Sequence, residues 1–147
     1  MMSRRHRIAL AALLLLAATQ AGAAGKLLIE HAWIRSAPPG AMMLAGYATL
    51  RNAGDTALTI AAAGSEDFGS VSLHQTIAEN GVERMRPLGD IEIAAGASVE
   101  FSPGGKHFML MKPQRELNAG MRVRIHISTK DGRVAAAADF IVAESAP

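Results

Sequence analysis

The sequence predicts an all-β domain, an antiparallel sandwich or barrel, on three observations. Turn-forming residues recur at short intervals after residue 25. The segments between them have the length and composition of strands, and no window holds a 3.6-residue apolar stripe of ten or more residues. Many short strands at nearly regular spacing are typical of antiparallel sandwiches and barrels.

The expected strands are each bounded by these turn signals. In chain order they are residues 27–35, 46–51, 58–63, 71–76, 82–88, 98–101, 107–111, 121–129 and 134–142. The bounding signals, also in order, are APPG (37–40), NAGD (52–55), ENG (79–81), AAG (94–96), PGG (103–105), NAG (118–120) and KDG (130–132). Residues 113–118 form at most one helical turn.

The first 23 residues have the pattern of a secretory signal peptide. MMSRRHR carries three arginines and no acidic residue, twelve largely apolar residues follow, and Ala21 and Ala23 supply the small residues of a cleavage site. Twelve residues are fewer than the roughly 20 that a helix needs to cross a bilayer, so a cleaved leader is favoured over an anchor. We expect a leader over residues 1–23, one exported domain over 24–147, and no membrane span after cleavage.

Charge and cysteine content exclude several classes of function. Loss of Arg4, Arg5 and Arg7 with the leader leaves 12 of the 15 basic residues against 13 acidic ones, so we expect no nucleic-acid partner. The chain has no cysteine, which excludes disulfide exchange, thiolate metal sites and lipid attachment through cysteine. Any site for a soft metal must therefore use thioether sulfur and imidazole.

The segment GGKHFMLM places such donors on one side of an expected strand. Side chains alternate along a strand, so His107 and Met109 share one face while Phe108 and Leu110 take the other. The two apolar residues suit a sandwich core. His107 and Met109 therefore face away from the core or lie at its rim.

A second pair of donors lies on a predicted hairpin. Asn80-Gly81 is the strongest short-range hairpin signal, and a two-residue turn there sets residue 74 opposite residue 87. Met85 is then the diagonal neighbour of His74 on the same face. Spacing alone predicts these two pairs, but it does not show that the pairs meet.

The order of these residues resembles that of a known family. His74, ten residues, Met85, twenty-one residues, His107, one residue and Met109 give the pattern H-x10-M-x21-H-x-M. Four blocks accompany it: AWIRSAPPG (32–40), GYATLRNAGD (46–55), GVERMRPL (81–88) and PGGKHFMLM (103–111). Together they resemble the PCuAC family of exported copper chaperones.

The resemblance implies a cupredoxin-like β-sandwich with a solvent-accessible Cu(I) site formed by His74, Met85, His107 and Met109. It further implies a periplasmic carrier that delivers copper to the CuA centre of cytochrome c oxidase subunit II, alongside a Sco-type thiol protein. We expect a monomer. Gln75 departs from the pattern, because many members have a glutamate after the first histidine.

The ligand types suit that chemistry. Cu(I) is soft and closed-shell, so it favours polarisable sulfur and accepts imidazole with little geometric demand. In an oxidising compartment, thioethers avoid the disulfide formation to which cysteine ligands are liable.

The remaining methionine and histidine residues are expected to have structural roles. Met111 is expected to pack in the core or at its rim, and the alternative is that it shields the site. Met42 and Met43 are expected to pack in the loop after APPG, and the alternative is that they supply auxiliary sulfur near the site. His31 and His126 are expected to be hydrogen-bonded in strands. The single tryptophan, Trp33, shares strand parity with Leu27 and Ile29, which predicts a core anchor.

Two other classes of function compete with copper transport. The sequence has no H-E-x-x-H, G-x-S-x-G or glycine-rich phosphate loop, so we expect that it is not an enzyme. The alternative is a non-metal β-sandwich adhesion or assembly module, in which the methionines only pack.

Overall fold

The computed structural model describes residues 26–147, so the predicted signal peptide lies outside the described residues. The described part contains ten strands and no helix, which confirms the all-β class and shows that the suggested helical turn at 113–118 is not formed. The strands are β1 (Leu27–Arg35), β2 (Met43–Asn52), β3 (Leu58–Gly64), β4 (Phe68–Glu79), β5 (Val82–Pro87), β6 (Ile91–Ile93), β7 (Ser98–Phe101), β8 (Lys106–Pro113), β9 (Arg122–Thr129) and β10 (Val134–Ala143). Over these residues, nothing helical is available to cross a membrane.

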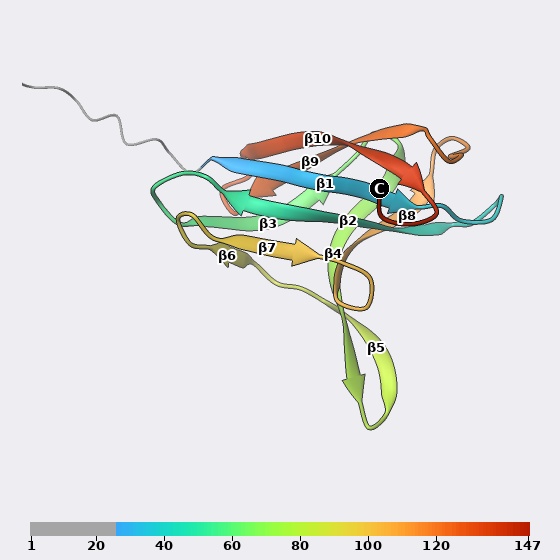
Figure 1. Cartoon of the computed structure of the whole chain (residues 1–147), viewed down its shortest axis with the longest axis horizontal. Helices are drawn as coiled ribbons and strands as arrows, with labels where there is room; N and C mark the ends of the chain where they lie inside the picture. The colour runs from blue at the N-terminus through green and yellow to red at the C-terminus, as the bar shows by residue number, and fades with distance from the viewer. Residues whose placement is uncertain (1–25) are drawn as a thin grey trace, which may run out of the picture.

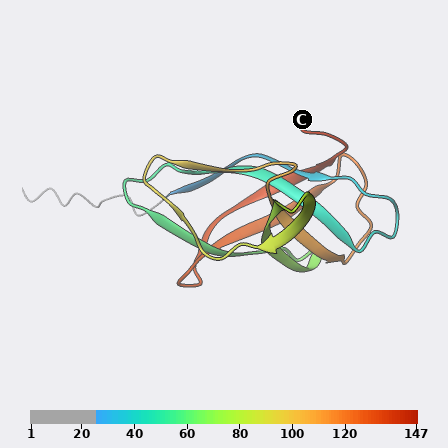
Figure 2. The same ribbon diagram turned by 90° about the horizontal axis from the view of Figure 1, so that it is seen from below.

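The sheet curves round on itself. Its strand order is β5-β4-β8-β2-β1-β10-β9-β3-β6, and a further pairing of β3 with β4 closes the ring. Figure 1 shows the long strands running side by side, and Figure 2 shows them crossing on the two sides of a flattened body. The strand pairs are antiparallel, as expected, except that β1 and β10 are parallel. No short hairpin joins these two strands, so their direction is not constrained by a tight turn.

The core lies inside the ring and is built from alternating residues of the strands. Phe108 stacks on Phe101 with ring centroids 4.7 Å apart and meets Phe140 edge-on at 5.5 Å. All three are buried, as is Leu110, the second core residue predicted on β8. This anchors β8 and leaves its other face for different side chains.

A bulge in β1 changes which residues face the core. Glu30 pairs with Thr49 and Trp33 pairs with Tyr47, so β1 has one residue more than β2 over this stretch. His31, exposed and with φ of 53°, takes up the extra residue. The predicted parity of Trp33 with Leu27 is therefore wrong. Trp33 is buried, but it lies on the opposite face of the sheet, against Tyr47.

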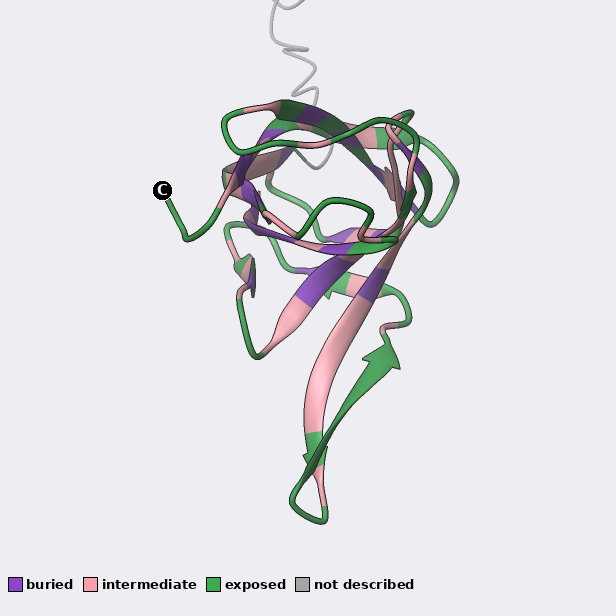
Figure 3. Ribbon diagram, turned by 90° about the vertical axis from the view of Figure 1, so that its right-hand side faces the viewer, coloured by how far each residue is buried: buried purple, intermediate pink, exposed green. Residues whose placement is uncertain are grey.

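The β4–β5 hairpin projects from the body as an arm (Figures 1 and 3). Asn80 and Gly81 both have positive φ, at 52° and 77°, as a tight hairpin turn requires. Every residue of β5 is exposed, whereas the start of β4 lies in the body. The predicted register is confirmed, because His74 pairs with Pro87 and Glu79 pairs with Val82.

Two polar clusters hold the connections. Asn52 is fully buried, and its side chain donates to the carbonyls of Thr56 and Ile93 and accepts from the Gly54 N–H, which fixes the NAGD turn against β6.

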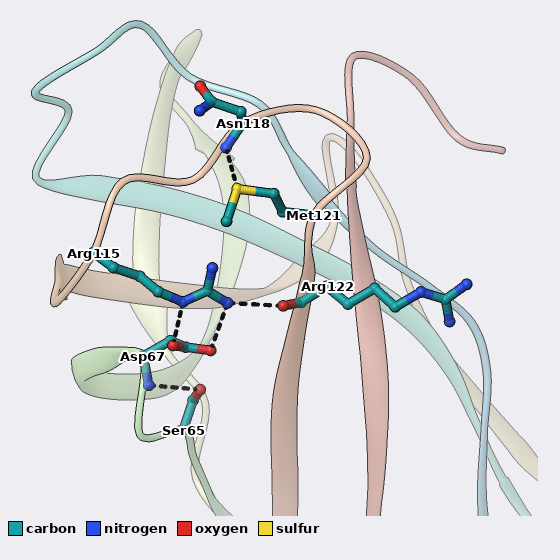
Figure 4. Close-up of polar contacts among 6 residues, drawn as sticks. All are labelled: Ser65, Asp67, Arg115, Asn118, Met121 and Arg122. Carbon is teal, nitrogen blue, oxygen red and sulfur yellow. Dashed lines mark hydrogen bonds and ion pairs between the residues drawn. The ribbon is translucent and has the colours of Figure 1, made fainter.

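Near the end of β8, Arg115 forms a two-point ion pair with Asp67, and Figure 4 shows the same guanidinium donating to the Arg122 carbonyl. The Arg115 hydrogen bonds lower the pKa of Asp67. These contacts hold residues 113–118 in an extended loop in place of a helical turn.

Candidate metal centre

Adjacent strands β4 and β8 bring the two histidines together. β8 pairs with β4 on one side and with β2 on the other. In the β4–β8 register, His74 lies directly opposite His107 and Ser72 lies opposite Met109. His107 and Met109 face away from Phe108 and Leu110, as the alternation predicted. The two donor pairs that spacing left separate therefore share one face of the sheet.

The His107 imidazole is buried and has one free nitrogen. Only 6% of the residue is exposed, so it lies at the buried rim of the site. Its Nδ1 is 3.2 Å from the Gly105 carbonyl oxygen, which also accepts the Thr76 N–H. A carbonyl can only accept, so Nδ1 carries the proton and the neutral ring presents a lone pair at Nε2. That Nε2 atom is buried and has no hydrogen-bond partner within residues 26–147.

A buried imidazole nitrogen without a partner is costly in a protein that uses the residue only for packing. In metal sites, one ring nitrogen is commonly held by a carbonyl while the other binds the metal. The PGG turn before β8 supplies that carbonyl through Gly105. The local sequence therefore sets both the position of His107 and its tautomer.

His74 lies beside His107 and is half-buried. The two ring centroids are 6.1 Å apart, with an angle of 23° between the ring planes. Ser72 Oγ lies 3.3 Å from His74 Nδ1. Burial lowers the pKa of His74, and the nearby His107 imidazole lowers it further. Both effects favour the neutral ring, which is the form that binds metals.

The two predicted thioether ligands differ in exposure. Met109 is partly buried on β8, whereas Met85 is 52% exposed on the projecting arm. Met85 pairs with Thr76, two positions from the His74–Pro87 pair, and is therefore the diagonal neighbour of His74. Met85, Met109 and His107 all line a cavity of about 280 Å³. His74, the fourth predicted ligand, is not among the lining residues and is the cross-strand neighbour of His107.

An aromatic and basic wall closes the cavity on the β1–β2 side. Arg35 and Tyr47 line it, and the Arg35 guanidinium lies 5.8 Å from the Trp33 ring and 5.7 Å from the Tyr47 ring. Such stacking holds the cation over the rings. The β1 bulge produces this wall, because it turns Trp33 to the same face as Tyr47.

Met43 is the lining residue that the sequence analysis placed wrongly. It is the first residue of β2, not a loop residue, and it lines the cavity with Met85, His107 and Met109. It was expected in a loop because it follows the APPG turn signal, and the expected strand began only at Gly46. Met43 pairs with Met111 across β2 and β8, a long-range contact that the sequence around residue 43 does not indicate.

The other sulfur and imidazole residues lie outside the cavity. Met42 is 61% exposed and lines a separate cavity of about 450 Å³ beside the Arg115 loop, which contains none of the four predicted ligands. Met111 is partly buried at the rim, as expected. His31 and His126 are both exposed, and His126 covers the backbone of Gly64. Within residues 26–147 no group of three or more His, Cys, Asp or Glu side chains is placed to hold a metal, so the donors gathered here are of the His and Met type.

The sequence matches a described family and two curated relatives. Residues 27–139 match the family described as "Putative lipoprotein LpqE-like". "Putative lipoprotein Lxx21020" of Leifsonia xyli subsp. xyli is 31% identical over 105 residues, 71% of this chain and 62% of that protein. "Uncharacterized protein RP573" of Rickettsia prowazekii is 34% identical over 80 residues, 54% of this chain and 44% of that protein. The chain thus spans less than two thirds of either relative.

Solved structures share the fold. "Solution structure of CuI-DR1885 from Deinococcus Radiodurans" is 27% identical, with 87% of this chain and 86% of that one covered and a TM-score of 0.64. "Copper-bound PCuAC domain from PmoF2" is 22% identical, covers 82% and 95% of the two chains and has a TM-score of 0.66. "Apo PCuAC domain from PmoF1" is 23% identical, covers 82% and 96%, and has a TM-score of 0.65. These likenesses confirm the predicted cupredoxin-like fold.

One feature distinguishes this sequence from what the family description says. Its 147 residues contain no cysteine to which a lipid could be attached. The match nevertheless covers most of the described residues, and the shared fold covers more than four fifths of the chain. The chain belongs to the LpqE-like family and is of the PCuAC type.

Proposed function

We propose that this protein is an exported carrier of Cu(I), which it binds through His74, Met85, His107 and Met109. The observation that carries the proposal is the buried Nε2 of His107, which has no hydrogen-bond partner among the described residues while Gly105 holds the other ring nitrogen. Two structurally similar proteins bear names that include copper or Cu(I). Here the metal is cargo, and the protein is not an enzyme.

The donor set suits a soft monovalent metal. Two thioethers and two neutral imidazoles bring no negative charge, so they match Cu(I) better than Mg²⁺ or Ca²⁺, which prefer oxygen ligands. Arg35 adds a positive charge at the rim of the cavity, which disfavours divalent cations more than monovalent ones. The site therefore selects by ligand softness and by charge.

The difference in exposure among the ligands gives an order of release. His107 and Met109 belong to β8, in the body of the sheet, whereas Met85 is exposed on the arm. An incoming sulfur or imidazole ligand of an acceptor reaches the Met85 side first and replaces it. The metal then leaves the buried side by further exchange, without a covalent or redox step.

The acceptor and the compartment follow from the resemblance. We propose that residues 1–23 direct export to the periplasm, that the protein acts there as a monomer, and that the acceptor is the CuA centre of cytochrome c oxidase subunit II, alongside a Sco-type thiol protein. The alternative, a non-metal adhesion or assembly module, does not account for the unpartnered nitrogen of His107.

Cu(I) titration of the purified protein under reducing conditions tests the binding step. Native mass spectrometry should show one copper per chain, and competition with a Cu(I) chelator should show weaker binding for each ligand variant. Unchanged affinity in all four ligand variants, or no stoichiometric copper adduct, would overturn the proposal. Transfer to an isolated CuA-containing domain then tests the acceptor separately. The variants are His74→Ala, Met85→Ala, His107→Ala and Met109→Ala, with Met42→Ala and His126→Ala as controls outside the cavity.

A further inference from the structure

A third sulfur atom lines the cavity of the candidate metal centre. Met43 lines the same cavity as Met85, His107 and Met109 and is 46% exposed. It lies on β2, a strand that carries none of the four predicted ligands. Neither the ligand pattern nor the family match assigns it a role.

The β2–β8 register places Met43 close to the ligand strand. Met43 pairs with Met111, and Ala45 pairs with Met109. Directly opposed side chains have Cβ atoms about 4.5–5.5 Å apart, and diagonal neighbours are within reach of long side chains. Met43 is the diagonal neighbour of Met109. Ala45, between them on the same face, has only a methyl group, so the space above it is left to the cavity.

The backbone of Met43 is fixed, in contrast to that of Met85. The Lys112 N–H donates to the Met42 carbonyl at 2.9 Å, and Met43 itself pairs with Met111 of β8. Met85 instead lies on β5, which has β4 as its sole partner in the described sheet and is exposed along its whole length. One thioether is thus held by the body of the protein and the other by a projecting arm.

We propose that Met43 is an exchange ligand, which binds Cu(I) in place of Met85 when the arm gives up the metal. This inference rests on the proposed function. During the exchange a bond from copper to the Met43 sulfur forms and the bond to the Met85 sulfur breaks. Both thioethers are neutral, so no proton or electron moves. His74, His107 and Met109 hold the metal throughout, and these three ligands are sufficient because Cu(I) makes little geometric demand.

The exchange ligand has a clear purpose in a carrier. An acceptor that displaces Met85 would otherwise meet a metal held on its buried side alone. When Met43 replaces Met85 as a ligand, the side of the metal that faced the arm is open to the acceptor and the metal stays bound. Met111, the cross-strand partner of Met43, is partly buried.

Methionine methyl NMR of the whole protein tests the inference. Protein with labelled methionine methyl groups is titrated with Cu(I) as wild type, Met85→Leu, Met43→Leu and the double variant, with Met42→Leu as the control. Both substituted side chains are about half exposed, so the core is retained. The Met43 methyl resonance should shift on loading of Met85→Leu. The double variant should bind Cu(I) about tenfold more weakly than Met85→Leu, because the two residues are coupled.

The outcomes separate this inference from the proposed function. If Cu(I) shifts the Met85 and Met109 methyl resonances but never that of Met43, and the double variant binds as Met85→Leu does, the exchange role is overturned and the copper site stands. If no methionine methyl resonance of the wild type shifts, both fall. A loss in Met42→Leu equal to that in the double variant would also overturn the role, since Met42 lines a different cavity.

Discussion

Replacement of His107 by leucine separates its cost to the fold from its value to the metal site. The free protein contains a buried Nε2 without a partner among the described residues, and such a group costs about 1–3 kcal/mol. The substitution also removes the bond from Nδ1 to Gly105, worth about 1 kcal/mol. The Gly105 carbonyl keeps the Thr76 N–H, so it is not left unpaired. We expect metal-free His107→Leu to be more stable than wild type by about 1 kcal/mol.

Loading with Cu(I) should reverse this order. A ligand that binds only the folded state adds RT ln(1 + [L]/Kd), about 2.7 kcal/mol at a free concentration of 100 Kd. Loss of residues that merely orient metal ligands weakens binding about 10–100-fold, so loss of a direct ligand should reach at least the upper figure. At the same free copper concentration, a variant with a hundredfold larger Kd gains only about 0.4 kcal/mol.

Urea unfolding with and without buffered Cu(I), under reducing conditions, measures both quantities. The dependence of the free energy of unfolding on urea should be unchanged between the proteins, since the folded state is retained. His126→Leu, in which an exposed imidazole on β9 is replaced, is the matched control and should keep the wild-type gain from copper. A metal-free His107→Leu protein that is less stable than wild type by about 1 kcal/mol or more would refute the reasoning. So would a full copper gain in that variant.

Two further predictions concern pH and a buried turn. The pKa of His74 is lowered below its ordinary value of 6.5. Cu(I) affinity, measured with a competing chelator, should therefore be constant from mildly basic pH down to about pH 6.5 and should fall at lower pH. An affinity that stays constant in acid would contradict histidine ligation. Below pH 6.5 the unfolded chain takes up this proton more readily than the folded one, so the metal-free protein should also lose stability there. Asn52→Leu leaves the carbonyls of Thr56 and Ile93 and the Gly54 N–H without their side-chain partner. It should lower the free energy of unfolding measured in urea by about 3 kcal/mol, whereas the exposed control Asn118→Leu should lower it by less than about 0.5 kcal/mol. A loss below about 1 kcal/mol in Asn52→Leu would show that these bonds are weak.

Local signals in the sequence were sufficient for the hairpin. Asn80-Gly81 determines the turn type through two positive φ angles, and the turn in turn determines that residue 74 faces residue 87. Alternation was also sufficient to divide β8 into a core face with Phe108 and a site face with His107. Both arguments depend on residues within a few positions of each other.

The pairing of the two histidines depends on long-range contacts between strands, which local signals do not determine. His74 and His107 belong to strands that pair across a long stretch of chain, and their register depends on how the whole sheet packs. Spacing therefore predicted two separate donor pairs and left their meeting to the family resemblance. Whether the four residues hold copper stays a prediction.

The two errors have different physical causes, one local and one long-range. The backbone of His31 adopts a positive φ, which its residue type does not predict. The resulting bulge moves Trp33 to the opposite face of the sheet from Leu27. Met43 was expected in a loop because it follows the APPG turn signal. Its strand is continued by pairing with Met111, a contact that no window around residue 43 contains.

The parallel pairing of β1 with β10 affects how the polypeptide reaches its final shape. β1 emerges first from the ribosome among the described strands, yet one of its edges has no neighbour until residues 134–143 have been translated. Contacts between segments so far apart in the sequence form slowly, because a long loop must close, at a cost in entropy, before the contacts can stabilise the fold. The ring therefore cannot be sealed on a nascent chain until its tenth strand has been synthesised, although β4 and its partner strands β5 and β8 are complete before then.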